Sequence, residues 1–220
     1  QYINKNKSNN ITNYKVIRNK VNLGTVKNFN NAIISSTGEY IIPLAIDDRF
    51  YDKNIVDYIV KEFKNNECLI LTGYREVCND IKYILPETKY VKILQSNQNN
   101  LYQELCKGNF ISGACTSYSK ELFIKYGLFD EEYRLLEDYP KYLQITRNYE
   151  KIYFIDIPII KYALGGVSTS VNPVLKRDFN LSIKKEILPY KNSTGIFIHR
   201  LKEFELLRSN DGNYIYKLII

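Results

Sequence analysis

The sequence predicts an α/β fold in which a mixed, mostly parallel sheet is flanked by helices and followed by a C-terminal helical extension. Short apolar runs of the buried-strand type alternate with amphipathic helical patterns along most of the chain. The chain has 220 residues, 45% of them hydrophobic, which suits one substantial core better than two. Residues 171–220 then carry a helical pattern with basic flanks. We therefore expect one α/β domain over residues 1–170 and an extension over 171–220 that packs on it.

The N-terminal part predicts the order strand, helix, strand, helix, strand. The expected strands are residues 14–18, 40–44 and 68–72, and the expected helices are residues 25–36 and 53–64. Gly38 follows the first helix and Asp52 precedes the second, as terminating and capping residues do. This alternation favours parallel strands covered by helices on both faces.

The second part gives weaker signals at first and clearer ones later. Residues 74–100 contain Pro86 and a polar run that mark connections around a helix or two. The segments expected after them are a strand at 112–118, a helix from Ser119 to Gly127, a helix from 136 to 148 and a strand at 152–155. Leu175, Phe179, Ile183 and Ile187, at four-residue spacing, predict an amphipathic helix. We expect this helix to pack on its own domain; the alternative is that it lies on an acidic membrane surface.

Composition excludes several classes of protein. Apolar runs fall far short of the roughly 20 residues that cross a bilayer, and the polar residues 1–10 lack the apolar core of a secretory signal. Four cysteines at spacings that match no zinc or redox motif suggest buried reduced thiols and a cytosolic compartment. The net charge of +7 favours anionic partners, but no nucleic-acid recognition motif accompanies it.

Two acidic pairs are the candidates for chemistry. Asp47 and Asp48 follow the expected strand at 40–44, where open parallel sheets collect ligands, and two such carboxylates can hold Mg²⁺ or Mn²⁺. Glu137 and Asp138 stand at an expected helix start. From the residues alone, an Asp-rich turn explains the first pair equally well, and helix capping explains the second pair better than catalysis does.

Other active-site types find little support. His199 is the single histidine, so histidine-rich metal sites are poorly supported. The sequence contains no G-x-S-x-G, G-x-G-x-x-G or P-loop motif. A diphosphate bound by this chain would therefore need a metal ion to help hold it.

The motifs, taken in order, resemble those of the family-2 glycosyltransferases. Asn22-Leu23-Gly24, Gly38-Glu39-Tyr40-Ile41 and Leu44 to Asp48 resemble the family's run from N-x-G through G-E-Y-I to its D-x-D metal motif. Residues 113–118, 123–133 and Glu137-Asp138-Tyr139-Pro140 resemble the segment that ends in the family's E-D motif. This resemblance covers about residues 14–170 and implies a GT-A fold, which is Rossmann-like.

The resemblance also implies roles. Asp48 with Asp47 would bind Mg²⁺ or Mn²⁺ and the donor diphosphate, and Lys27 and Asn30 would assist donor binding. Asp138 would be the general base of an inverting transfer and Glu137 would support it, while Gly113 would lie on the acceptor side. The expected donor is a nucleotide diphosphate sugar, a UDP-sugar before others, and the expected acceptor is a glycan or a lipid-linked molecule.

Three features depart from the family pattern. Ala45 replaces the first carboxylate of the usual D-x-D-D run, and Phe29 stands where an Arg is common, a loss for which Lys27 could compensate. The initial strand with its D-D-x-S-x-D segment is not recognised, and the chain contains no methionine. We therefore expect a chain that lacks an N-terminal portion.

The resemblance implies a hexosyltransferase in cell-surface polysaccharide or glycolipid synthesis. The Q-x-x-R-W motif of processive synthases is absent, which favours the addition of single sugars. By analogy with the family, the enzyme would act in the cytoplasm or peripherally at the inner face of the plasma membrane. The alternative is a non-catalytic remnant that no longer binds the donor.

Overall fold

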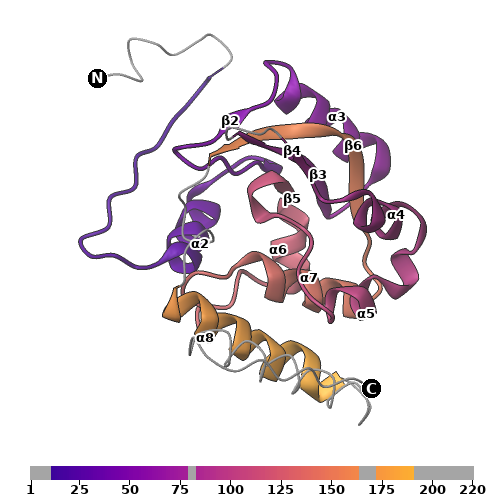
Figure 1. The fold of residues 1–220 in the computed structure, drawn as a ribbon. Coiled ribbons are helices and arrows are strands. Elements are labelled where there is room, and N and C mark those ends of the chain that lie inside the picture. The colour runs from indigo at the N-terminus through magenta and orange to yellow at the C-terminus, as the bar shows by residue number, and fades with distance from the viewer. Residues whose placement is uncertain (1–10, 79–82, 164–171, 191–220) are drawn as a thin grey trace, which may run out of the picture.

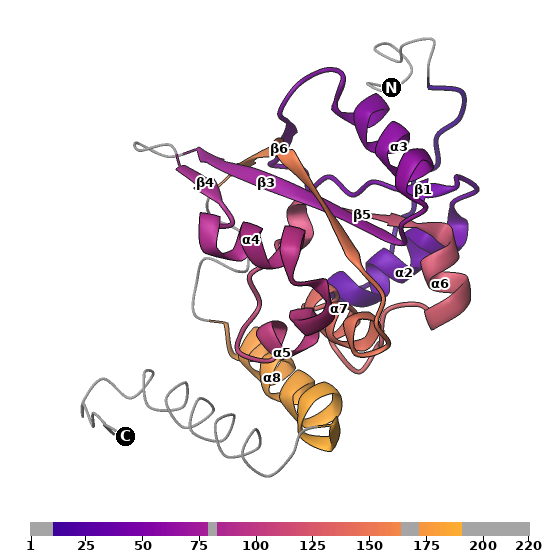
Figure 2. The ribbon, with the colours of Figure 1, turned by 90° about the vertical axis from the view of Figure 1, so that its right-hand side faces the viewer.

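The computed structural model describes residues 11–78, 83–163 and 172–190 of the chain. Its strands form one mixed sheet in the order β1-β5-β3-β6-β2, with β4 paired to β3. The strands are β1 (Tyr40–Ile41), β2 (Arg49–Phe50), β3 (Ile70–Cys78), β4 (Tyr83–Leu85), β5 (Thr116–Ser119) and β6 (Ile152–Ala163). The two long strands β3 and β6 lie side by side and form the centre of the sheet (Figures 1 and 2).

The prediction of a mostly parallel sheet is wrong for the described strands. Only β3 and β6 pair in parallel among them, whereas β1–β5, β2–β6, β3–β4 and β3–β5 are antiparallel. Strands and helices do alternate, but alternation leaves strand direction open, and β5 enters beside β3 from the opposite end, with Ile70 facing Tyr118. The strand expected at 14–18 is also wrong, since this stretch is exposed and belongs to no strand.

The helices agree well with the sequence pattern. They are α2 (Thr25–Ser35), α3 (Ile55–Asn66), α4 (Thr88–Ser96), α5 (Leu101–Leu105), α6 (Lys120–Tyr126), α7 (Asp138–Arg147) and α8 (Pro173–Ser182), which continues into a π-helical turn (Ile183–Ile187). Short 3₁₀ turns lie at Gln98–Asn100, Gly113–Cys115 and Leu188–Tyr190. Ser119 caps α6 as predicted, because its Oγ accepts the Glu121 N–H at 3.3 Å.

Two apolar clusters lie on opposite faces of the sheet. Consecutive residues of β3 point to opposite sides, so Ile70 belongs to one cluster and Leu71 to the other. Helix α3 covers one face through Ile55, Ile59 and Phe63. Helices α2 and α4 to α7 lie on the other side of the sheet (Figure 2), and their side chains contribute to the larger cluster. The sheet is therefore covered on both faces, as expected.

Helix α8 lies along the larger cluster, and Leu175 and Phe179 pack against it. The boundary predicted at residues 170 and 171 and the histidine at 199 fall outside the described residues. Within the described part, no helix is long and apolar enough to cross a bilayer. Among the described residues, Cys68, Cys106 and Cys115 form no disulfide bond; Cys106 and Cys115 are buried and Cys68 is half-buried.

Candidate active site

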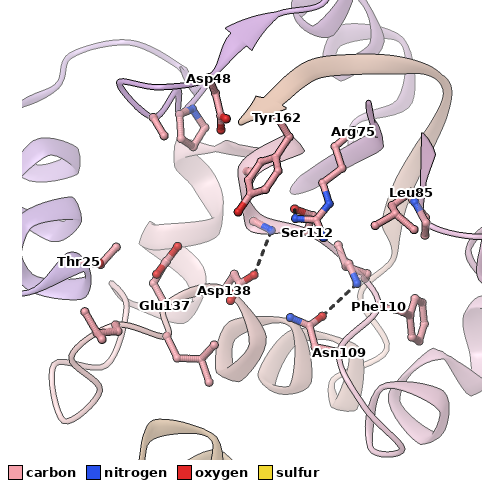
Figure 3. A pocket seen from close by; sticks show the side chains of 18 of the residues that line it. Thr25, Asp48, Arg75, Leu85, Asn109, Phe110, Ser112, Glu137, Asp138 and Tyr162 are labelled. Atoms are coloured by element: carbon pink, nitrogen blue, oxygen red, sulfur yellow. Dashed lines mark hydrogen bonds between the residues drawn. The ribbon is translucent and has the colours of Figure 1, made fainter. Parts of the chain in front are cut away.

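A cavity of about 990 Å³ lies between the sheet and the helices. Segments far apart in the sequence line it: the start of α2, the turn before β2, strands β3 and β4, and residues 109–114 and 135–138. Both acidic pairs line this cavity. In Figure 3, Asp48 faces it from one side and Glu137 and Asp138 from another. The tertiary structure thus brings together two pairs that the sequence could only suggest separately.

Asp48 lies directly before β2, after a turn in which its N–H donates to the Ala45 carbonyl at 3.2 Å. Its side chain is 6% exposed, and its Oδ1 accepts the Ala163 N–H at the end of β6 at 2.9 Å. Burial raises the pKa of the Asp48 carboxyl, and the neighbouring Asp47 carboxylate adds to this effect. Asp47 itself is exposed. The first pair therefore combines one anchored, buried carboxylate with one free to reorient.

Asp138 is the first residue of α7 and is 9% exposed. Its Oδ1 accepts the Tyr139 N–H at 2.7 Å, and its Oδ2 accepts the Gly113 N–H at 3.0 Å. Glu137 precedes it at the N-cap position without making a capping hydrogen bond. The helix N-terminus favours negative charge on both carboxyls.

Burial and mutual repulsion raise the pKa of this second pair. The pKa of Glu137 rises to about 8, through burial first and the charge of Asp138 second. Burial also raises the pKa of Asp138, but the N–H donors of Tyr139 and Gly113 oppose that rise. When the pair holds one proton, Glu137 is therefore the better place for it. These two N–H donors favour the ionised form of Asp138, which is the form that a general base requires.

Gly113 holds Asp138 in place through its lack of a side chain as well as through its N–H. A Cβ at this position would lie 2.8 Å from Asp138 Oδ2 and 3.1 Å from its Cγ. Any larger residue would therefore push the carboxylate away. Gly113 also lines the cavity, beside the second acidic pair, and its acceptor-side role stays a prediction.

Lys27 and Asn30 do not line the cavity. Asn30 is 1% exposed, and its side chain accepts the Phe129 N–H and donates to the Phe129 carbonyl and to Glu131. Lys27 forms an exposed ion pair with Glu131 at 3.7 Å. Both side chains thus tie α2 to the loop before α7, and this geometry gives no support to their predicted role in donor binding.

The same loop is held by Gly24 and by α8. Gly24 has φ +82°, and a Cβ there would lie 2.6 Å from the Arg134 carbonyl oxygen, so glycine allows α2 to start against the loop. From α8, the fully buried Asp178 accepts the N–H groups of Arg134 and Leu135 at 2.8 and 2.7 Å. These contacts set the path of the chain into Glu137 and Asp138.

Sequence reasoning missed Arg75, Ser112 and Tyr162, which also line the cavity. The expected strand ended at residue 72, but β3 continues to Cys78 and carries Arg75 to the cavity. The sequence carried little signal for this extension, because Arg75 stands next to Glu76 and after Thr72 and Gly73, a polar stretch that did not suggest a continuing strand.

The carboxylates of Asp47 and Asp48 fit a hard divalent cation in kind, because Mg²⁺ and Mn²⁺ prefer oxygen ligands. Within the described residues, no group of three or more His, Cys, Asp or Glu side chains could hold a metal ion. Two carboxylates nevertheless suit a site that substrate phosphates complete. The buried Asp48 beside a second carboxylate, with its raised pKa, is a place where a cation would relieve repulsion.

Comparison with known proteins decides the family. The model of the family described as "Glycosyl transferase family 2" matches residues 1–127, more than half of the chain. The chain belongs to glycosyl transferase family 2. This family-2 glycosyltransferase is also 25% identical over 199 residues to an uncharacterized glycosyltransferase of Rickettsia typhi, covering 84% of its own chain and 61% of that relative.

Solved structures agree on the fold. This family-2 glycosyltransferase resembles S. aureus TarS 1–349 in complex with UDP-GlcNAc, with a TM-score of 0.58 and 16% identity over 89% of its chain and 58% of TarS 1–349. A second structure of S. aureus TarS 1–349 has a TM-score of 0.59 and 17% identity to this chain, over 93% of this chain and 58% of TarS 1–349. The chain thus spans about three fifths of the length of these relatives. The likeness shows that this chain shares the mixed α/β fold of TarS.

Proposed function

We propose that this chain transfers a sugar from a nucleotide diphosphate donor to an acceptor hydroxyl with inversion at the anomeric carbon. One observation carries the proposal: Asp47-Asp48 and Glu137-Asp138, far apart in the sequence, line the same cavity. The first pair suits a cation and a diphosphate, and the second suits proton removal. Family membership supports the reaction class, and a TarS structure that contains UDP-GlcNAc supports a UDP-sugar as donor.

The chemistry divides between the two pairs. As the acceptor oxygen attacks the anomeric carbon, Asp138 takes the proton from the hydroxyl, and the bond from that carbon to the diphosphate breaks with both electrons on the phosphate oxygen. Glu137, protonated beside it, limits the negative charge near the incoming oxygen and favours ionisation of Asp138. Asp47 and Asp48 would hold Mg²⁺ or Mn²⁺, which when bound neutralises the charge that develops on the leaving diphosphate.

The proposal extends to the acceptor class and to the cellular location. We propose a glycan or lipid-linked acceptor and a hexose-type sugar, in cell-surface polysaccharide or glycolipid synthesis on the cytoplasmic side. Cys68, Cys106 and Cys115 form no disulfide bond among the described residues, which agrees with a reducing compartment.

Binding is the first test. The chain is melted with UDP and with UDP-GlcNAc, each with and without Mn²⁺, beside the variant Asp48→Asn. We expect stabilisation by UDP that requires Mn²⁺ and is lost in Asp48→Asn. A matched control, Asp57→Asn on the exposed face of α3, should respond as the unchanged chain does.

Transfer is the second test. Asp138→Asn should bind UDP and Mn²⁺ normally yet lose transfer from UDP-GlcNAc by about 10²- to 10⁴-fold, the usual contribution of a general base. Cooperative melting without any response to UDP and Mn²⁺ would instead indicate a remnant that no longer binds the donor.

A further inference from the structure

Arg75 is a cation that faces an acidic cavity and has no acidic partner in the described structure. Among the described lining residues it is the sole basic one, alongside the acidic Asp47, Asp48, Glu87, Glu137 and Asp138. None of the ion pairs found within the described residues includes it. A charged group placed in a cavity without a counter-ion requires an explanation.

Two neighbours hold the guanidinium in a defined orientation. Its Nη1 donates to Ser112 Oγ at 3.1 Å, and its carbon lies 4.6 Å from the centre of the Tyr162 ring. Figure 3 shows the side chain extending from β3 toward Ser112. Stacking and hydrogen bonding together reduce the rotamer freedom that a ligand would otherwise have to remove.

The guanidinium nevertheless retains an unused donor. Its Nε is buried and makes no hydrogen bond among the described residues, where only one other buried side-chain atom is in that condition. A buried donor without an acceptor costs folding free energy, so such atoms are rare unless something else binds them. The edge that contains Nε is one that binds two oxygens of a phosphate or carboxylate at once.

The position of Arg75 indicates which part of the reaction it serves. Ser112 precedes Gly113, whose N–H binds Asp138, so the guanidinium lies beside the proposed base. The charge of Arg75 also acts on the Asp48 carboxyl, where it opposes the rise in pKa that burial causes. Arg75 therefore lines the cavity close enough to both acidic pairs to act on a substrate bound there.

We propose that Arg75 binds an oxyanion of a substrate through its Nε edge, a phosphate or carboxylate group located in the cavity that both acidic pairs line. This inference rests on the proposed function for the identity of the substrates. The oxyanion has two sources, the diphosphate of the donor or an acidic group on the acceptor, and binding experiments can tell them apart.

The experiment measures the affinity of the unchanged chain, Arg75→Met and Arg75→Gln for two pairs of probes by calorimetry. UDP with Mn²⁺ is compared with uridine, and glycerol 3-phosphate with glycerol. Arg75→Gln keeps a polar contact for Ser112 and serves if Arg75→Met fails to fold. Lys64→Met, on the exposed side of α3, controls for the loss of one positive charge.

We expect both Arg75 variants to bind one phosphate probe about 10- to 100-fold more weakly, as for loss of a charged hydrogen bond, with uridine unaffected. Loss for UDP assigns the oxyanion to the donor, and loss for glycerol 3-phosphate assigns it to the acceptor. Affinities within twofold of the unchanged chain for both probes would overturn the inference, as would an unchanged chain that binds neither. If the unchanged chain binds glycerol 3-phosphate through Arg75 but never UDP, the proposed donor function fails and the anion site stands.

Discussion

Replacing Asp178 by alanine tests whether α8 supports the loop that carries the proposed base. The Asp178 side chain is fully buried, and one oxygen accepts the N–H groups of Arg134 and Leu135 at 2.8 and 2.7 Å. Its other oxygen accepts from the Arg177 guanidinium at 3.0 Å. Asp178→Ala leaves two backbone donors without an acceptor, just before Glu137 and Asp138.

The magnitude follows from those two donors. Each buried N–H without a partner costs about 1–3 kcal/mol, which gives about 2–6 kcal/mol for the pair. Both bonds are only part-buried, so water replaces the carboxylate to some degree, and we expect about 2–4 kcal/mol. The ion pair adds little because the Arg177 side chain is 59% exposed. This is a large fraction of the roughly 5–15 kcal/mol that stabilises a folded domain.

The assay is urea unfolding monitored by circular dichroism. The free energy of unfolding in water, extrapolated from its linear dependence on urea concentration, is compared among the variants. Asp178→Asn keeps an acceptor oxygen of the same size and should lose less than half as much as Asp178→Ala. Asp57→Ala removes an exposed carboxylate from the first turn of α3 and should cost at most about 1 kcal/mol. A loss for Asp178→Ala no greater than that for Asp57→Ala would refute the reasoning.

Three further predictions concern the second acidic pair and its supports. Gly113→Ala should lower the transfer rate at least about tenfold, because the new Cβ would displace the Asp138 carboxylate, and should leave the affinity for UDP with Mn²⁺ within about twofold. Steady-state kinetics test this prediction, with Gly38→Ala as the control, because a Cβ at residue 38 would make only ordinary contacts. The pKa of Glu137 is about 8 in the folded state, against an ordinary value of 4.5. The contribution of Glu137 to the free energy of unfolding should therefore fall as the pH rises from 4.5 to about 8. Urea unfolding at pH 5 and 8 should then show Glu137→Gln gaining stability relative to the unchanged chain at the higher pH, and a pH-independent difference would contradict this. Lys141→Met should lower the free energy of unfolding by about 2–4 kcal/mol, since the buried Nζ donates to the Tyr126, Gly127 and Leu128 carbonyls at the end of α6. Thermal unfolding measures this loss, and the exposed Lys64→Met is the control.

The sequence determined the local elements because their causes are local. The apolar spacing of α2, α3, α7 and α8 and the Ser119 cap of α6 depend on residues within a few positions of each other. It also placed Glu137 and Asp138 at the start of α7. Asp47 and Asp48 were expected after a buried strand of a parallel sheet, but they follow the short antiparallel strand β1 at a distance and lie directly before β2. The order of motifs identified the family that the family model confirms. A prediction from neighbouring residues succeeds where neighbouring residues carry the information.

Only the tertiary structure decided which of those residues meet. Strand direction depends on pairing across the chain, so β5 could lie antiparallel to β3 and leave the sheet mixed. The convergence of Asp48 with Asp138, the close fit of Gly113 on Asp138 and the extension of β3 to Arg75 all depend on contacts between distant segments. Asn30 shows the same limit in reverse, because its motif position suggested donor binding while packing commits its side chain to Phe129. Burial, partners and pKa are properties of an environment, and that environment exists only once the chain has folded.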